Sequence, residues 1–137
     1  MRSVRTGVSA VTYEANSVVV VGGFNGIRRL RSTEFYDHRI GLWYPLPEME
    51  ITSNNYRCIA SRSNFGIEIM NGSIYIAGGF DGTRTTSTVE RFDMRACKWE
   101  VGKQLVLTGT QHHISSGYTK SEFSFLKALE SLKRSVK

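Results

Sequence analysis

Hydrophobic and polar positions alternate in two blocks of this chain, and each block carries the same phrase. The phrase is VVVVGGFNG at residues 18–26 and IYIAGGFDG at residues 74–82. In both copies a short apolar run stops at a glycine pair, an aromatic residue follows, and Asn-Gly or Asp-Gly closes the phrase. An apolar run of this length predicts a strand buried on both faces. The paired glycines predict positive φ or a close approach of the backbone to neighbouring side chains.

The two blocks stay in register well beyond this phrase. Nine residues of the first block return 56 residues later in the second. They are Gly22, Gly23, Phe24, Gly26, Arg28, Glu34, Asp37, Arg39 and Trp43, which return as Gly78, Gly79, Phe80, Gly82, Arg84, Glu90, Asp93, Arg95 and Trp99. Self-similarity at a fixed period indicates a repeat architecture.

Each block predicts four short strands joined by tight turns. In the first block the strands are expected at 5–13, 18–21, 33–37 and 42–44, the last one stopped by Pro45 and Pro47. In the second block they are expected at 64–70, 73–77, 88–93 and 98–101. Asn71-Gly72, between two apolar runs, is typical of a two-residue hairpin turn in which both residues need positive φ. A four-stranded antiparallel unit recurring at a period near 50, with one Trp per unit, is typical of a β-propeller blade.

The blocks resemble the kelch repeat. The resemblance rests on GGFNG, RLRSTE and GGFDG, on RSNFGIE at Arg62–Glu68, and on the Trp of each fourth strand. It covers about residues 2–105 and is strongest to the last blades of BTB–BACK–kelch substrate adaptors for cullin-based ubiquitin ligases. The fold that it implies is all-β, with two four-stranded antiparallel kelch blades of an incomplete β-propeller.

The expected organisation is a kelch blade at 2–47, an inserted loop at 48–61, a second kelch blade at 62–105 and a non-kelch tail at 106–137. The insertion is either a rim loop at which partners dock or a retained or misassigned stretch of coding sequence. The tail is expected to be disordered or to form a short helix over 121–134. Because propellers need about four to eight blades to close a ring, the chain is expected to be a fragment of a longer protein.

Charge and termini narrow the class of partner. The net charge is +6, of which residues 1–105 supply 13 basic against 10 acidic residues. The repeat region is therefore close to an ordinary mixed surface, which argues against a nucleic-acid partner. The N-terminus has no apolar core of a signal peptide, and Val18–Val21 is far shorter than the ~20 residues of a membrane helix. We expect a cytoplasmic protein without a membrane partner, in which Cys58 and Cys97 are reduced thiols.

No catalytic, cofactor or metal motif is recognisable, so the chain is not expected to be an enzyme. The glycine phrases lack the spacing of a phosphate-binding loop. His112 and His113 are adjacent, which excludes the i, i+4 pair of a helical metal site. A kelch-type oxidase would need Tyr, His and Cys ligands, and these cannot be assembled from His38, His112 and His113.

Binding is the function that the resemblance implies. The family's substrate contacts fall on seven positions, namely Arg5, Phe24, Asn25, Arg62, Ser63, Phe80 and Asp81, with Arg28, Arg29 and Arg84 at the rim. Two alternatives stay open for Arg5 and Arg62. Each either binds a carboxylate of an acidic peptide in a bidentate manner or forms a salt bridge within the propeller.

The other repeated residues are expected to be structural. Gly22, Gly23, Gly78 and Gly79 shape the backbone, Glu34 and Glu90 accept hydrogen bonds from neighbouring backbone groups, and Trp43 and Trp99 pack between blades. The resemblance implies a substrate-recognition role, with dimerisation and cullin binding left to the BTB and BACK domains of a parent protein. The alternative is a fragment of a cytoskeletal kelch protein that binds actin.

Overall fold

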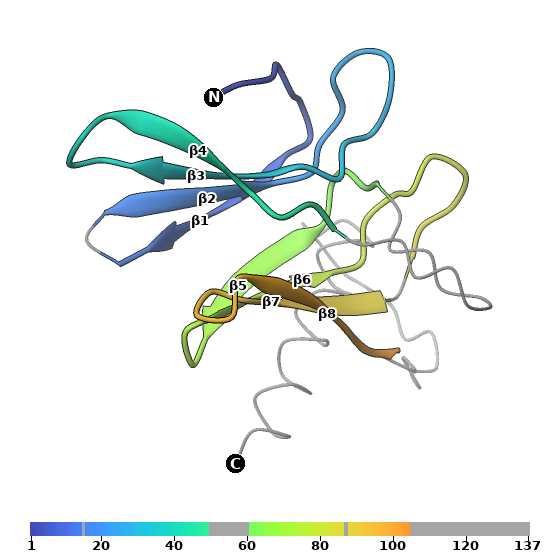
Figure 1. Cartoon of the computed structure of the whole chain (residues 1–137). Coiled ribbons are helices and arrows are strands. Elements are labelled where there is room, and N and C mark those ends of the chain that lie inside the picture. The colour runs from blue at the N-terminus through green and yellow to red at the C-terminus, as the bar shows by residue number, and fades with distance from the viewer. Residues whose placement is uncertain (15, 50–60, 87, 105–137) are drawn as a thin grey trace, which may run out of the picture.

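The computed structural model describes residues 1–14, 16–49, 61–86 and 88–104 (Figure 1). Predictions for most of the inserted loop, for the tail from residue 106, and for Cys58, His112 and His113 lie outside these residues. Within them the fold is all-β, without a helix, which confirms the expected class. It follows that no described segment is a helix of the length and hydropathy that crossing a bilayer requires.

Two four-stranded antiparallel sheets make up the structure. The first has the order β1-β2-β3-β4 and the second the order β5-β6-β7-β8, so each strand pairs with its neighbours in sequence. The strands are β1 (Ser9–Tyr13), β2 (Ser17–Val21), β3 (Thr33–Asp37), β4 (Leu42–Leu46), β5 (Gly66–Met70), β6 (Ser73–Ala77), β7 (Thr88–Asp93) and β8 (Lys98–Gln104).

The strand positions agree with the sequence pattern except at some strand ends. The fourth strand was expected to stop before Pro45, but β4 continues through Pro45 to Leu46, and Pro45 lies opposite Glu34 of β3. Proline is tolerated there because β4 is the last strand of its sheet and a missing N–H on the outer side breaks no ladder. The first strand of each sheet begins later than expected, at Ser9 and Gly66.

The β5–β6 turn has the predicted hairpin geometry. Asn71 and Gly72 both have positive φ, of 50° and 72°, and Met70 pairs directly with Ser73. This backbone twist matches that of the flanking strands, as expected for an Asn-Gly loop. The corresponding β1–β2 turn is one residue longer and uses Asn16 at φ 65°.

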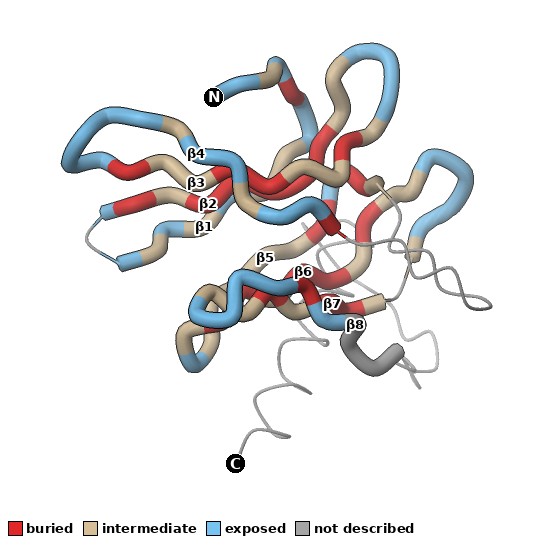
Figure 2. Tube along the Cα trace, viewed as in Figure 1, coloured by how far each residue is buried: buried red, intermediate tan, exposed pale blue. Residues whose placement is uncertain are grey.

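The hydrophobic core lies between the two sheets (Figure 2). Val19 and Val21 of β2 belong to one cluster with the second sheet's Ile74, Ile76, Phe92 and Trp99. Since neighbouring strand residues point to opposite faces, Val18 and Val20 face away from this cluster. Val18 and Val20 are the repeat equivalents of Ile74 and Ile76, so the first sheet packs with one face and the second with the opposite face.

Backbone contacts join the blades beside the glycine pairs. The Gly23 N–H donates to the Arg62 carbonyl at 2.9 Å, and the Asn64 N–H donates to the Gly7 carbonyl at 2.9 Å. Gly22 has φ 61°, and a Cβ added there would lie 2.7 Å from the Arg62 carbonyl oxygen. Both of the predicted reasons for a glycine therefore hold at Gly22.

Candidate protein-binding surface at the loop end of the blades

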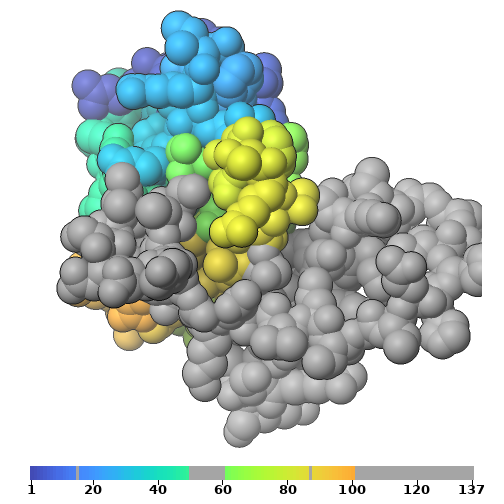
Figure 3. Space-filling model, turned by 90° about the vertical axis from the view of Figure 1, so that its right-hand side faces the viewer, coloured from blue at the N-terminus to red at the C-terminus, as the bar shows by residue number. Residues whose placement is uncertain are grey.

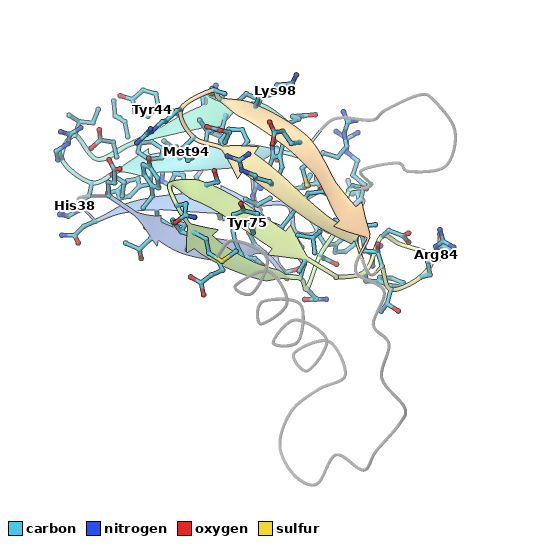
Figure 4. All side chains as sticks on the ribbon, turned by 90° about the horizontal axis from the view of Figure 1, so that it is seen from below. His38, Tyr44, Tyr75, Arg84, Met94 and Lys98 are labelled. Atoms are coloured by element: carbon cyan, nitrogen blue, oxygen red, sulfur yellow. The ribbon has the colours of Figure 1, made fainter. Side chains whose placement is uncertain are left out.

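Two loops leave the glycine pairs at the same end of the molecule. They cover residues 24–30 after β2 and 80–86 after β6, and Figure 3 shows them next to each other, the first in light blue and the second in yellow. Figure 4 shows Arg84 on the second loop at the end of the molecule opposite His38. The loop end is therefore distinct from the end that carries the β3–β4 turn.

Asn25 and Asp81 give the two loops the same fold. The Asn25 Oδ1 atom accepts from the backbone N–H groups of Ile27 at 3.0 Å and Arg28 at 2.8 Å. The Asp81 Oδ1 atom accepts from those of Thr83 at 2.8 Å and Arg84 at 2.9 Å. The hydrogen bonds from Arg84 and Thr83 lower the pKa of Asp81 because they stabilise its charged form. Both predicted contact residues thus also shape their loops.

Arg5 and Arg62 follow the second of their two alternatives, because each forms an ion pair inside its own blade. Arg5 pairs with Glu34, and Arg62 pairs with Glu90, with all four side chains almost fully buried. The Arg62 Nη1 atom also donates to the Gly78 carbonyl at 3.1 Å, and its Nη2 atom donates to Thr88 Oγ1 at 3.0 Å. Arg5 makes the equivalent contacts to the Gly22 carbonyl at 2.9 Å and to Ser32. Both guanidinium groups are thereby occupied by the scaffold.

The two glutamates were expected to accept from backbone groups, and among the described residues such a bond is found for Glu34 and not for Glu90. Its Oε2 atom accepts from the Arg2 N–H at 2.7 Å, in addition to the ion pair with Arg5. The bond that the structure gives Glu90 comes from the Arg62 side chain. Burial raises the pKa of Glu90 to about 7, against the opposing effect of the Arg62 charge.

The remaining predicted contact residues form two groups, those at the base of the loops and those exposed at the rim. Phe24 and Phe80 are half-buried at the roots of the loops, where Phe24 bridges to Thr6 and Phe80 to Ser63. Ser63 is itself buried. Arg28 and Arg84 are exposed at the rim, and Arg84 lies 3.9 Å from the Asp81 carboxylate.

Arg29 connects the two loops. Its guanidinium carbon lies 4.4 Å from the centre of the Phe80 ring and 5.5 Å from that of Phe24. Its Nε atom donates to Ser63 Oγ at 3.3 Å. The structure therefore brings Phe24, Ser63 and Phe80 together around a residue that the sequence pattern placed only at the rim.

Ile27, at the tip of the first loop, was not predicted as a contact residue, yet it is 89% exposed. The sequence did contain one indication that Ile27 and Arg29 have a role other than forming the repeat. The second repeat has Thr83 and Thr85 at the equivalent positions, so these two side chains are not part of what the repeat conserves between its copies.

The two tryptophans have different surroundings. Trp99 is 3% exposed, belongs to the core between the blades, and donates from Nε1 to the Pro47 carbonyl at 3.0 Å. Trp43 is only half-buried and contacts Tyr36 of its own sheet, with ring centres 5.0 Å apart. The predicted packing between blades is thus seen for Trp99, whereas Trp43 lies on the face of the first sheet that points away from the second.

Over the ranges that the structure covers, no three His, Cys, Asp or Glu side chains are grouped as metal ligands. Cys97 is an exposed free thiol in the turn between β7 and β8.

Comparison with known proteins gives two repeats, each of which encloses one of the two sheets. The family described as Kelch motif matches residues 5–50 and 61–105. A kelch repeat-containing protein of Caenorhabditis elegans, kel-10, is 46% identical over 97 residues, which are 71% of this chain and 16% of that protein.

Two further relatives carry a second named domain. The kelch repeat and BTB domain-containing protein F47D12.7 of C. elegans is 44% identical over 84 residues, 61% of this chain and 14% of that protein. The F-box/kelch-repeat protein At5g03020 of Arabidopsis thaliana is 25% identical over 121 residues, 86% of this chain and 31% of that protein. The chain thus spans less than a third of the length of each of these three relatives.

Proposed function

The chain belongs to the kelch-repeat family, and from this premise we propose that it is the substrate-recognition part of an adaptor for a cullin-based ubiquitin ligase. Kelch repeats form protein-interaction domains. The names of two relatives add a BTB domain or an F-box to the kelch repeats, which supports the adaptor role. In this proposal the parent protein is cytoplasmic, dimerises and binds the cullin through BTB and BACK domains, and this chain contributes only the contact with the substrate.

The observation that carries the proposal is the pair of aromatic residues that both blades present at one end. Phe24 and Phe80 stand half-exposed after the glycine pairs, with exposed arginines around them. Aromatic side chains and arginines of this kind supply most of the binding energy in protein interfaces. The rim arginines Arg28 and Arg84 favour a protein substrate with an acidic segment, because complementary charge speeds association and selects the partner.

We also propose a setting for this role from the resemblance of the repeat phrases to those of kelch-like protein ten, an adaptor associated with male germ cells. A substrate of spermatogenic cells is therefore the first class of substrate to test.

The test is capture from cells that express the full-length natural protein, with and without residues 1–105. We expect the full-length protein to capture a cullin and a set of substrates that accumulate when the proteasome is inhibited. The shortened protein should still capture the cullin but lose the substrates. Failure to capture a cullin would remove the adaptor role, and substrates retained after the deletion would remove the recognition role from this chain.

Filamentous actin is the alternative partner and serves as the comparison. In a co-sedimentation assay we expect the chain to stay in the supernatant. Saturable co-sedimentation with filaments would replace the adaptor proposal by a cytoskeletal one.

A further inference from the structure

We propose that Arg29 is the residue of this surface that binds a carboxylate of the protein partner, in an acidic segment that also carries an apolar side chain. The inference rests on the proposed function, to which it adds the recognising residue and the chemistry of the ligand. It also moves carboxylate recognition away from Arg5 and Arg62, whose guanidinium groups are buried in ion pairs with Glu34 and Glu90.

Arg29 is held in one orientation by contacts from both blades. Its guanidinium carbon lies 4.4 Å from the Phe80 ring centre and 5.5 Å from the Phe24 ring centre, and Nε donates to Ser63 Oγ at 3.3 Å. A guanidinium stacked on aromatic rings retains its outward N–H groups for a planar anion. Because the side chain is already ordered, less conformational entropy is lost when a ligand binds.

Arg29 forms no ion pair within the described part of the chain, although its charge is near enough to Asp81 to help lower the pKa of that carboxyl. The ion pairs found there use Arg5, Arg31, Arg39, Arg62, Arg84 and Arg91. Among the described residues, the Nη atoms of Arg29 donate no hydrogen bond, and only its Nε atom does so. The Nη atoms of Arg5 and Arg62, in contrast, donate to the scaffold. Arg29 therefore combines a fixed position with an available charge, whereas Arg28 has the charge but is exposed at the rim.

The comparison of the two blades separates binding from folding. A side chain that a kelch blade needs for its fold recurs in both copies, as the Arg5–Glu34 and Arg62–Glu90 pairs do. Arg29 does not recur, since the second blade has Thr85 at this position, and Thr85 still makes the bridge to Phe80 that Arg29 makes to Phe24. The backbone of the loop thus forms without an arginine here.

Ile27 supplies the second half of the ligand's chemistry. It is 89% exposed on the same loop, two residues from Arg29, and the Asn25 side chain fixes the backbone beneath it. A large apolar side chain presented on an ordered turn is suited to an apolar contact. Together with Arg29 it fits an acidic segment in which a carboxylate and an apolar side chain are neighbours.

The test uses the whole chain and two fluorescein-labelled peptides in an anisotropy titration. One peptide alternates Glu and Leu over eight residues, and the other replaces every Glu by Gln. We expect the wild-type chain to bind the Glu peptide at least about tenfold more tightly, the scale of a hydrogen bond to a charged group. Arg29→Thr, which introduces the residue of the second blade, should abolish this preference and leave the affinity for the Gln peptide within about twofold.

Arg95→Thr is the matched control, because it removes the same charge from the exposed turn after β7, at the other end of the blade. It should retain the preference for the Glu peptide. A preference that survives Arg29→Thr would overturn the inference, as would a fall in affinity for both peptides together with a lower thermal midpoint, which would mark Arg29 as a link between blades only. Equal binding of both peptides by the wild-type chain would overturn the acidic ligand, while the proposed function would still be decided by the deletion experiment in cells.

Discussion

The arginine that opens each blade illustrates how one residue type serves either a surface or a scaffold. The Arg62 side chain reaches across its blade to Glu90 and to the carbonyl of Gly78, the first residue of the glycine pair. It therefore fixes the start of the blade to the backbone directly after β6 and to β7. Its planar group and five donors suit such a multiple contact as well as they suit a ligand carboxylate.

Arg62→Ala is expected to unfold much of the protein at pH 8. The substitution leaves the Glu90 carboxylate buried without its partner, which costs about 3–5 kcal/mol, a large part of the stability of a small domain. Urea unfolding followed by circular dichroism measures this loss, with Arg95→Ala as an exposed control that should change little. A variant as stable as the wild type but defective in capture would instead return Arg62 to the binding surface.

Glu90 should also make stability depend on pH. Folding raises the pKa of its carboxyl from 4.5 to about 7, so folding takes up a proton between these values. The contribution of Glu90 to stability is then full below pH 4.5 and is lost as the pH rises through 7. Relative to Glu90→Gln, the wild type should lose about 3 kcal/mol of unfolding free energy over this interval, measured by urea titrations at pH 4.5, 6 and 8. If the stability of the wild type relative to Glu90→Gln instead increased with pH, folding would lower the pKa of Glu90 rather than raise it.

At the scale of elements, the glycine pairs decide how closely the blades approach. Gly22 lies against the Arg62 carbonyl and the Phe65 ring, and Gly79 lies against the Ser63 carbonyl and Phe65 of its own blade. The backbone turns there with positive φ and leads directly into one of the two loops of the candidate surface. Each glycine pair thus ends a core strand, allows close contact with its neighbours and positions the aromatic residue that follows it.

Gly22→Ala and Gly26→Ala separate contact from backbone strain. Both residues have positive φ, but a Cβ at Gly22 would lie 2.7 Å from the Arg62 carbonyl, whereas a Cβ at Gly26 would meet nothing within 4 Å. We expect Gly26→Ala to cost about 1 kcal/mol from strain and Gly22→Ala about 1–3 kcal/mol more from crowding. The difference between their urea midpoints measures the crowding, and equal midpoints would show that the blades move apart without cost.

At the scale of the whole molecule, the outward faces of the two blades differ. The first blade turns Tyr36 and Trp43 outward, a face equivalent to the one that the second blade buries. The second blade turns outward Arg91, which pairs with Asp93 at 2.9 Å and with Glu100 at 2.9 Å. One end of the pair is therefore apolar and the other is charged.

Because residues of both blades form one core cluster, we expect the chain to unfold in one transition. A thermal melt followed by far-UV circular dichroism should coincide with one followed by the fluorescence of Trp99, whose surroundings come from both blades. The fluorescence melt is recorded on the Trp43→Phe variant, so that the signal comes from Trp99. Two separated transitions would show that each blade is stable alone.

Local patterns in the sequence were sufficient for the elements of this fold. The apolar runs before the glycine pairs predicted the central strands, and Asn71-Gly72 predicted its turn, because a two-residue loop with positive φ at both positions admits few other residues. The repeat of Glu34 as Glu90 predicted a structural role for both. The strands and the turn depend on neighbours in sequence, and the repeat is visible when the two halves of the chain are compared, so one sequence contains the information for all of them.

The partners of long side chains depended on the tertiary structure. The sequence left Arg5 and Arg62 between a ligand and an internal ion pair, and only the packed blade, which brings Glu34 and Glu90 within reach, decides for the ion pair. It also separates Trp99 in the core from Trp43 on an outward face, although the repeat makes them equivalent. The sequence by itself determined the glycine pairs, the strands and the repeat. The position of Arg29 between Phe24 and Phe80 was decided by the packing of two blades, because its contacts come from residues up to 51 positions away in the chain.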